Sequence, residues 1–184
     1  MALKYAGIEY EHREIVLRNK PQSMLLASPK GTVPVLCAGE RILEQSLDIM
    51  RWALDVSDSD GWLQVDQSIS EGWLEKNDGP FKTLFDQYKY PERYPHLNQE
   101  EILNAAIELM LRPMEAALES NSYLLSDKLS WVDVAIFPFI RQFAMSNKPR
   151  FESLRFPNLQ SWLNQFIESE LFNSVMHRYP AWID

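Results

Sequence analysis

The sequence predicts a small α/β domain in residues 1–57, followed by an all-helical domain in residues 58–184. Three observations carry this prediction. Short apolar segments of strand and helix character alternate up to about residue 56. The polar, turn-rich stretch DVSDSDGW follows at residues 55–62. Beyond it, apolar and aromatic residues recur at helical spacing almost to the end of the chain, so we expect a domain boundary near residue 57.

The first domain reads as alternating helices and strands. In chain order, we expect a helix over 1–6, a strand over 9–17, a short helix or turn over 19–27, a strand over 32–37, a strand over 41–43 and a helix over 46–56. Gly7 suits the left-handed position that often follows a helix. Ser46 is a favoured N-cap residue, and we expect it to cap the last of these helices.

The second domain reads as helices only. They are expected over 62–74, 80–88, 98–119, 130–145, 157–169 and 170–177. Asn98 and Glu101 have capping spacing at the start of the longest helix, where Pro113 predicts a kink. Ser130 and Asp133 have the reciprocal spacing of a capping box, which gives Asp133 a structural role.

Composition excludes several classes of function. The chain has 184 residues, a formal net charge of −8 and a pI of about 4.9, without the basic stripe that a nucleic-acid partner requires. Its single cysteine, Cys37, excludes an internal disulfide and any dithiol C-x-x-C chemistry. The three histidines have no metal-ligand spacing, so we predict no metal site and no catalytic histidine. Without a signal-peptide pattern or an apolar run of about 20 residues, the chain is expected to be a soluble, cytoplasmic protein.

Pro34 is unusual because it lies inside the predicted strand 32–37. Proline cannot donate a hydrogen bond to a strand ladder, and it is normally confined to edge strands or to segments that face something else. Either an edge strand or a ligand-facing segment would explain it.

Three motifs resemble one family. They are V-P-V-L at residues 33–36, Gln45-Ser46 at the start of a helix, and SWVDVAIFPF at residues 130–139. Together they are similar to the glutathione S-transferase superfamily, and YKYPERYP at 88–95 resembles a bacterial branch of it. The resemblance covers essentially the whole chain, and it implies a thioredoxin-like N-terminal domain followed by an all-helical C-terminal domain.

The resemblance also implies a glutathione site. Pro34 would follow a cis peptide bond, and the backbone of Val33 would pair with glutathione like an added strand. Gln45 and Ser46 would meet the γ-glutamyl end of glutathione at a helix N-terminus, which favours an anion. Lys30 would neutralise the glycyl carboxylate.

Each of these residues also has a plain structural interpretation. Pro34 would sit on an edge strand, Ser46 would only cap its helix, and Gln45 and Lys30 would be solvated. Many members of the family have glutamate at the position of Gln45. Glu44 lies one position early, so Gln45 is preferred as the contact. Cys37 is expected to be a small buried hydrophobe.

The catalytic position of the family has no counterpart here. Members open with a strand and then a loop whose Cys, Ser or Tyr holds the glutathione sulfur, whereas this chain begins MALKYAG, which resembles the last turns of the following helix. No residue is therefore assigned as catalytic. The first strand would lie between strands 9–17 and 32–37, and its absence predicts a gap of about 9–10 Å. A start further upstream, closure by strand slippage or a partner chain, and a partly mobile α/β domain all stay open.

The resemblance implies a protein that binds glutathione and conjugates or transfers it to a small hydrophobic electrophile, held near FDQYKYPERY at residues 85–94. It also implies a homodimer. Activity is expected for a protein with the catalytic loop rather than for these residues alone. The alternative is a non-catalytic binding or assembly module, because a fold does not fix a function.

Overall fold

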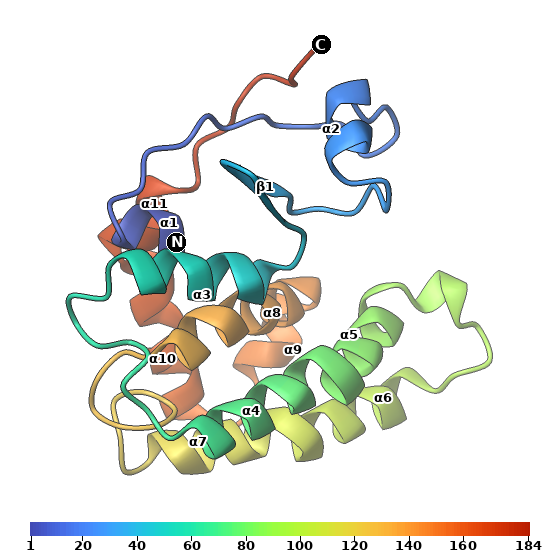
Figure 1. Ribbon diagram of the computed structural model, residues 1–184. Helices are drawn as coiled ribbons and strands as arrows, with labels where there is room; N and C mark the ends of the chain where they lie inside the picture. The colour runs from blue at the N-terminus through green and yellow to red at the C-terminus, as the bar shows by residue number, and fades with distance from the viewer. The chain divides into compact units, whose positions relative to one another are not determined.

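A computed structural model describes residues 1–184 and divides into two compact units (Figure 1). Unit 1 comprises Met1–Asp60 together with Glu170–Asp184, and unit 2 comprises Gly61–Ser169. The sequence placed a boundary near residue 57 and gave the whole remainder to the helical domain. In the structure, unit 1 extends to Asp60 and also includes the C-terminal residues, which pair with its N-terminal part.

Unit 1 contains four helices and one hairpin. They are α1 (Ala2–Tyr5), α2 (Gln22–Ala27), β1 (Leu36–Ala38), β2 (Arg41–Leu43), α3 (Ser46–Val56) and α11 (Glu170–Ser174). Helix α1 packs against α3. The chain leaves α1 through Gly7, whose φ of +68° lies in the left-handed region, as the sequence predicts.

The hairpin of unit 1 is shorter than expected. β1 and β2 pair antiparallel, with Leu36 opposite Leu43 and Ala38 opposite Arg41, around a turn at Gly39. The predicted strand 32–37 is wrong over residues 32–35. Pro34 has no N–H to donate, so this stretch cannot form a continuous ladder with a neighbour.

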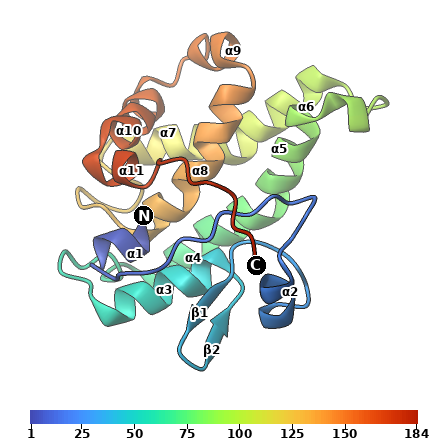
Figure 2. The same cartoon turned by 90° about the horizontal axis from the view of Figure 1, so that it is seen from above.

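The predicted strand 9–17 also fails to form a ladder. Only two isolated bridges occur there, a parallel one between Glu14 and Ala181 and an antiparallel one between Val16 and Asn19. A strand needs a neighbour along its length, and here the neighbour is the C-terminal segment, which runs beside these residues in Figure 2. Pairing with the chain's own C-terminal segment was not among the predicted ways of filling the gap.

Unit 2 is helical, as predicted. Its elements are α4 (Gln67–Lys76), the π-helix η1 (Asn77–Phe81), α5 (Lys82–Lys89), the 3-10 turn η2 (Pro91–Arg93), α6 (Gln99–Ala106), the π-helix η3 (Ile107–Leu111), α7 (Arg112–Leu118), α8 (Trp131–Ser146), α9 (Lys148–Glu152) and α10 (Pro157–Glu168). None of these helices, nor any in unit 1, is both long and apolar enough to cross a membrane.

Two prolines in unit 2 lie in or next to π turns. The separately predicted helices 62–74 and 80–88 form one continuous run of α4, η1 and α5, which begins after the N-cap Asp66 and passes through Pro80 within η1. Pro113 follows η3 directly. A π turn redistributes the backbone hydrogen bonds around a residue that lacks an N–H, so helix continues past both prolines.

Buried carboxylates fix the core of unit 2. Asp133 accepts hydrogen bonds from the backbone N–H groups of Leu124 (2.8 Å) and Ser130 (3.2 Å), and from the indole of Trp162 (3.1 Å). The Ser130 hydroxyl also donates to this carboxylate at 2.5 Å, and its oxygen accepts the Asp133 backbone N–H, so the predicted capping box of α8 is present. The structural role predicted for Asp133 agrees with these contacts. In the same way, Glu115 accepts from the first turn of α10.

Candidate functional site

The segment before β1 presents its backbone to solvent. Val33 is 49% exposed and Pro34 is also exposed, and the peptide bond between them is cis in the structure. This stretch, which bends at Val33, enters β1 two residues after Pro34. Its N–H and C=O groups lie outside the β1–β2 ladder and can accept a further extended chain.

The hairpin brings the predicted site residues to one place. Leu36 on β1 pairs with Leu43 on β2, and the two strands run antiparallel. Beyond this pair the ladder stops, but the contacts of Ser28 and Lys30 with Glu44 hold the loop that leads to Val33 against the residue that precedes Gln45. The topology therefore juxtaposes the segment before β1 with the start of α3, although these residues are separated by the whole hairpin in sequence.

The start of α3 differs by one residue from the prediction. Gln45 is the N-cap residue, because its carbonyl accepts the first helical hydrogen bond, from the Ile49 N–H at 3.0 Å. Ser46 is therefore the first helical residue, and the prediction that it is the N-cap is wrong. No side chain caps this helix. Gln45 and Ser46 are both exposed, so the first N–H groups of an eleven-residue helix face solvent beside them.

Lys30 is paired within the protein. Its ammonium lies 3.1 Å from Glu44 Oε2, and the other carboxylate oxygen of Glu44 accepts the hydroxyl of the fully buried Ser28 at 2.5 Å. The Ser28 hydroxyl first, and then Lys30, hold the pKa of Glu44 below its usual range. These two contacts tie the loop that leads to Pro34 onto the residue that precedes Gln45.

Ser28 and Glu44 are positioning residues that the sequence did not reveal. In the sequence, Glu44 stands out only as a glutamate one position before Gln45, the position at which many family members have glutamate. Ser28, which lies sixteen residues before Glu44 in the chain, belongs to no periodic pattern that would predict the contact. Cys37 was predicted to be buried, and the structure contradicts this, since its side chain is exposed. Successive side chains of a strand point to opposite faces, and Leu36 and Ala38 take the half-buried face of β1.

Unit 2 has a pocket of about 640 Å³ between α5, α8 and the turn that follows α5. Its lining is partly aromatic and partly charged. The residues are Asp78, Gly79, Lys82, Thr83, Phe85, Asp86, Lys89, Tyr90, Tyr94, Phe139 and Gln142. Most of them fall within or near the stretch 85–94 that the sequence associates with a second substrate.

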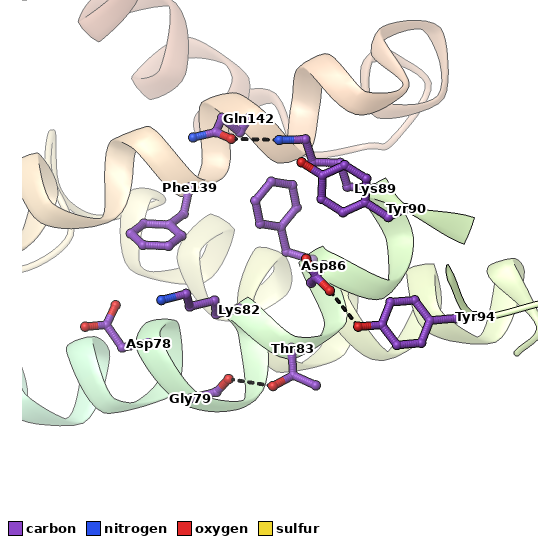
Figure 3. A pocket seen from close by; sticks show the side chains of 11 residues that line it. Asp78, Gly79, Lys82, Thr83, Asp86, Lys89, Tyr90, Tyr94, Phe139 and Gln142 are labelled. Atoms are coloured by element: carbon purple, nitrogen blue, oxygen red, sulfur yellow. Dashed lines mark hydrogen bonds between the residues drawn. The ribbon is translucent and has the colours of Figure 1, made fainter. Parts of the chain in front are cut away.

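Hydrogen bonds fix several of the lining side chains (Figure 3). Lys89 donates to Gln142 at 3.0 Å, which links α5 to α8. The Tyr94 hydroxyl donates to Asp86 at 2.6 Å, and this bond raises the pKa of Tyr94 above its usual range. The Lys89 ammonium also lies 5.4 Å from the centroid of the Phe85 ring. The pocket thus combines aromatic surface with held polar groups, a composition typical of small-molecule sites.

Two family profiles match the chain. The profile described as "Glutathione S-transferase, N-terminal domain" matches residues 1–59, and that described as "Glutathione S-transferase, C-terminal domain" matches residues 86–170. Among individual proteins, the chain is 28% identical over 177 residues to the probable glutathione S-transferase parA of Nicotiana tabacum. That match covers 92% of this chain and 79% of the relative.

Solved structures share the fold. A glutathione transferase from Burkholderia graminis, solved with two glutathione molecules bound per subunit, superposes with a TM-score of 0.76 at 18% identity, covering 94% of this chain and 79% of the other. Glutathione S-transferase 1-6 from Anopheles dirus has a TM-score of 0.78 at 15% identity, covering 94% and 84%. With both domain profiles matched in the expected order, the chain belongs to the glutathione S-transferase superfamily.

Proposed function

We propose that this chain binds glutathione in unit 1 and, as a transferase, joins it to a small hydrophobic electrophile held in unit 2. The observation that carries the proposal is that the hairpin and the contacts of Glu44 connect the unpaired Val33–Pro34 segment to the start of α3, which no side chain caps. Relatives of the same fold were solved with glutathione bound, which supports the choice of ligand.

Each residue of the proposed glutathione site has a physical role. The backbone of Val33 pairs with the peptide part of glutathione by strand addition, with Pro34 holding the shape of this segment. The γ-glutamyl carboxylate lies at Gln45 and Ser46, where unpaired N–H groups and the helix dipole stabilise negative charge. An ammonium has three donors, so Lys30 can bind the glycyl carboxylate while keeping its contact with Glu44.

The electrophile occupies the pocket of unit 2. Phe85 and Phe139 supply apolar surface, and Lys89 and Tyr94 are held by hydrogen bonds at its edge. Catalysis then consists of holding two reactants in proximity, together with stabilisation of the glutathione thiolate. No residue of the described chain is assigned the thiolate-stabilising role.

We further propose a homodimer located in the cytoplasm. The family supports the dimer. The single cysteine supports a reducing compartment, since nothing in the chain depends on a disulfide.

Calorimetric titration of glutathione tests the binding site. Replacing Ser46 by Ala removes a hydroxyl beside the bound carboxylate, and the affinity should fall about ten-fold, since a hydrogen bond to a charged group is worth about 1.5–3 kcal/mol. Ser68→Ala is the matched control, because Ser68 is also an exposed serine in the first turn of a helix, α4. Equal affinities in both variants would show that glutathione binds elsewhere.

Steady-state kinetics with glutathione and an electrophilic aromatic compound test the proposed electrophile pocket of unit 2. Phe139→Ala should raise KM for the aromatic substrate several-fold and leave glutathione affinity unchanged, whereas Met145→Ala, at an exposed position of the same helix, should change neither. Turnover by this chain would exclude the alternative of a non-catalytic binding module.

A further inference from the structure

The charged side chains of the unit 2 pocket are unequally satisfied. Two carboxylates, Asp78 and Asp86, and two ammonium groups, Lys82 and Lys89, line the pocket. Both carboxylates accept hydrogen bonds from neighbouring side chains, whereas neither ammonium forms an ion pair. The charge that is left for a ligand to neutralise is therefore positive.

Each carboxylate is held by the protein. The Asn77 amide donates to Asp78 Oδ1 at 2.8 Å, and Asn77 is only 1% exposed, so it fixes the position of that carboxylate. The Tyr94 hydroxyl donates to Asp86 Oδ2 at 2.6 Å, and the Arg93 guanidinium lies 4.0 Å from the other oxygen, Oδ1. Asp86 is thus compensated from two sides, which leaves little of its negative charge for a ligand.

Lys82 has no polar partner in the protein. Asp78 lies four positions earlier, a spacing that pairs opposite charges on an α-helix. The residues between them belong to the π-helix η1, whose hydrogen bonds span five residues rather than four, and no ion pair joins the two side chains. In Figure 3 the Lys82 ammonium points away from Asp86 and Tyr94, toward the side of the pocket where Phe139 lies.

Lys89 is bound by groups that leave its charge uncompensated. Its ammonium donates to Gln142 Oε1 at 3.0 Å and lies 5.4 Å and 5.1 Å from the ring centroids of Phe85 and Tyr90. Gln142 is neutral, and an ammonium has three donors, so two of them stay available. The rings around it supply the flat apolar surface on which an aromatic ligand packs. The pocket therefore combines aromatic surface with two ammonium groups on one helix, α5.

We propose that the electrophile bound in unit 2 is an aromatic compound with an acidic substituent, such as a carboxylate. The ring packs against the aromatic side chains of the pocket, and the anionic group lies at Lys82, with Lys89 adding to the positive potential. The acidic group serves binding only and takes no part in the transfer of glutathione. This inference rests on the proposed function, because it names the class of the second substrate.

Two simple ligands test the inference without turnover. They are para-nitrobenzoate and para-nitrobenzamide, which share a ring and differ by one negative charge. Amide NMR spectra of the full-length chain, recorded without glutathione, give the affinity of each ligand and the residues that it contacts. The carboxylate should bind about five-fold more tightly than the amide, as expected for one exposed ion pair, with large shifts at Lys82 and Phe139.

Substitutions of opposite sign assign the preference to the pocket. Lys82→Gln should lower the affinity for the carboxylate about three- to five-fold, and Asp78→Asn should raise it about two-fold, because a repelling charge is lost. Neither should alter the affinity for the amide. Lys128→Gln, at an exposed lysine of unit 2 outside the pocket, is the matched control and should change neither affinity.

Equal affinities for the two ligands in the unaltered chain, or a preference that survives Lys82→Gln, would overturn the inference. Calorimetric titration of glutathione into the same samples separates this outcome from failure of the proposed function. Glutathione binding without a preference for the carboxylate would overturn the inference and leave the proposed function in place. A preference that Lys82→Gln removes, in a chain that does not bind glutathione, would overturn the proposed function and leave the anion site in place.

Discussion

The two units of the molecule are packed very differently. Of the buried apolar residues, twenty-seven lie in unit 2 and only five in unit 1. Large exposed apolar side chains show the opposite distribution, with ten of twelve in unit 1. Unit 1 is the smaller, but its size does not account for this difference. Its elements are held instead by polar and backbone contacts, such as the Ser28–Glu44–Lys30 cluster and the pairing of residues 179–184, which we call the strap, with Glu14.

This contrast agrees with the functions proposed for the two units, which are glutathione binding in unit 1 and binding of a small electrophile in unit 2. Unit 2 can confine a pocket because its helices are fixed by a dense core, and protein interiors of this kind change little on binding. Unit 1 leaves a backbone edge unpaired at Val33–Pro34, and such an edge is what an extended ligand needs. Sparse packing and peptide recognition therefore occur together in unit 1, and the following experiments probe the comparison.

The largest effect is expected at the buried carboxylate of unit 2. Asp133→Ala leaves the buried indole of Trp162 and two backbone N–H groups without their acceptor. The free energy of unfolding, measured with urea, should fall by about 4 kcal/mol or more, since each unsatisfied buried group costs about 1–3 kcal/mol.

Asp127→Ala is the matched control for that experiment. Asp127 also accepts hydrogen bonds, from the Ser122 N–H and hydroxyl, but it is exposed and water can replace it. Its loss should cost less than about 1 kcal/mol. If both variants unfolded at similar urea concentrations, the buried network would not be the source of the stability of unit 2.

The next effect compares the same substitution in the two units. Ile136 on α8 is fully buried, whereas Ile42 on β2 is 47% exposed. Ile136→Ala creates a cavity and should lower the free energy of unfolding by about 2–5 kcal/mol. Ile42→Ala should change it by about 0.5 kcal/mol or less, because water already reaches the side chain. A comparable loss in Ile42→Ala would show that unit 1 has a core that the exposed fractions do not reveal.

The same contrast explains which parts of the fold the sequence predicted. The helices of unit 2 bury one face each, and such burial leaves a periodic pattern that can be read directly. The capping box of Ser130 and Asp133 is local as well, since its two residues lie three positions apart. The π turns beside Pro80 and Pro113 were missed, because a proline shows that a helix must adjust without showing how.

In unit 1 the features that the sequence did not predict depend on contacts between residues far apart in the chain. The stretch 9–17 has strand character, but whether a ladder forms depends on a neighbour, which turned out to be Ala181. The residues of the proposed glutathione site came from the resemblance. The pairing of Lys30 and Ser28 with Glu44 had no signal in sequence. Cys37 was misjudged because an apolar strand suggests burial on both faces, whereas this hairpin has only one covered face.

The smallest expected effect concerns pH and the strap. Hydrogen bonds from the Ser23 hydroxyl, and then from the Ser23 N–H, hold the pKa of Asp184 below its usual value. A carboxylate with a lowered pKa in the bound state stabilises that state at neutral pH, and the contribution is lost as the pH falls through the lowered pKa. Acidification from pH 6 to pH 3 should therefore weaken the binding of the strap, whereas a change from pH 8 to pH 6 should leave this contribution unchanged.

The ring-proton resonances of Tyr179 measure this release, because they report its stacking on His12, whereas the Trp182 indole N–H donates to the titrating Asp184 carboxylate itself. His12, Arg13 and Glu14 also contact the strap and are ionisable, so the variant Asp184→Asn is needed to isolate the contribution of the Asp184 carboxylate. The population of released strap should rise about two- to five-fold on acidification in the unaltered chain, as expected for an exposed polar contact. The asparagine variant should show a smaller rise. An equal rise in both chains would assign the pH response to His12 or Glu14, and a rise above pH 6 would contradict a carboxylate origin altogether.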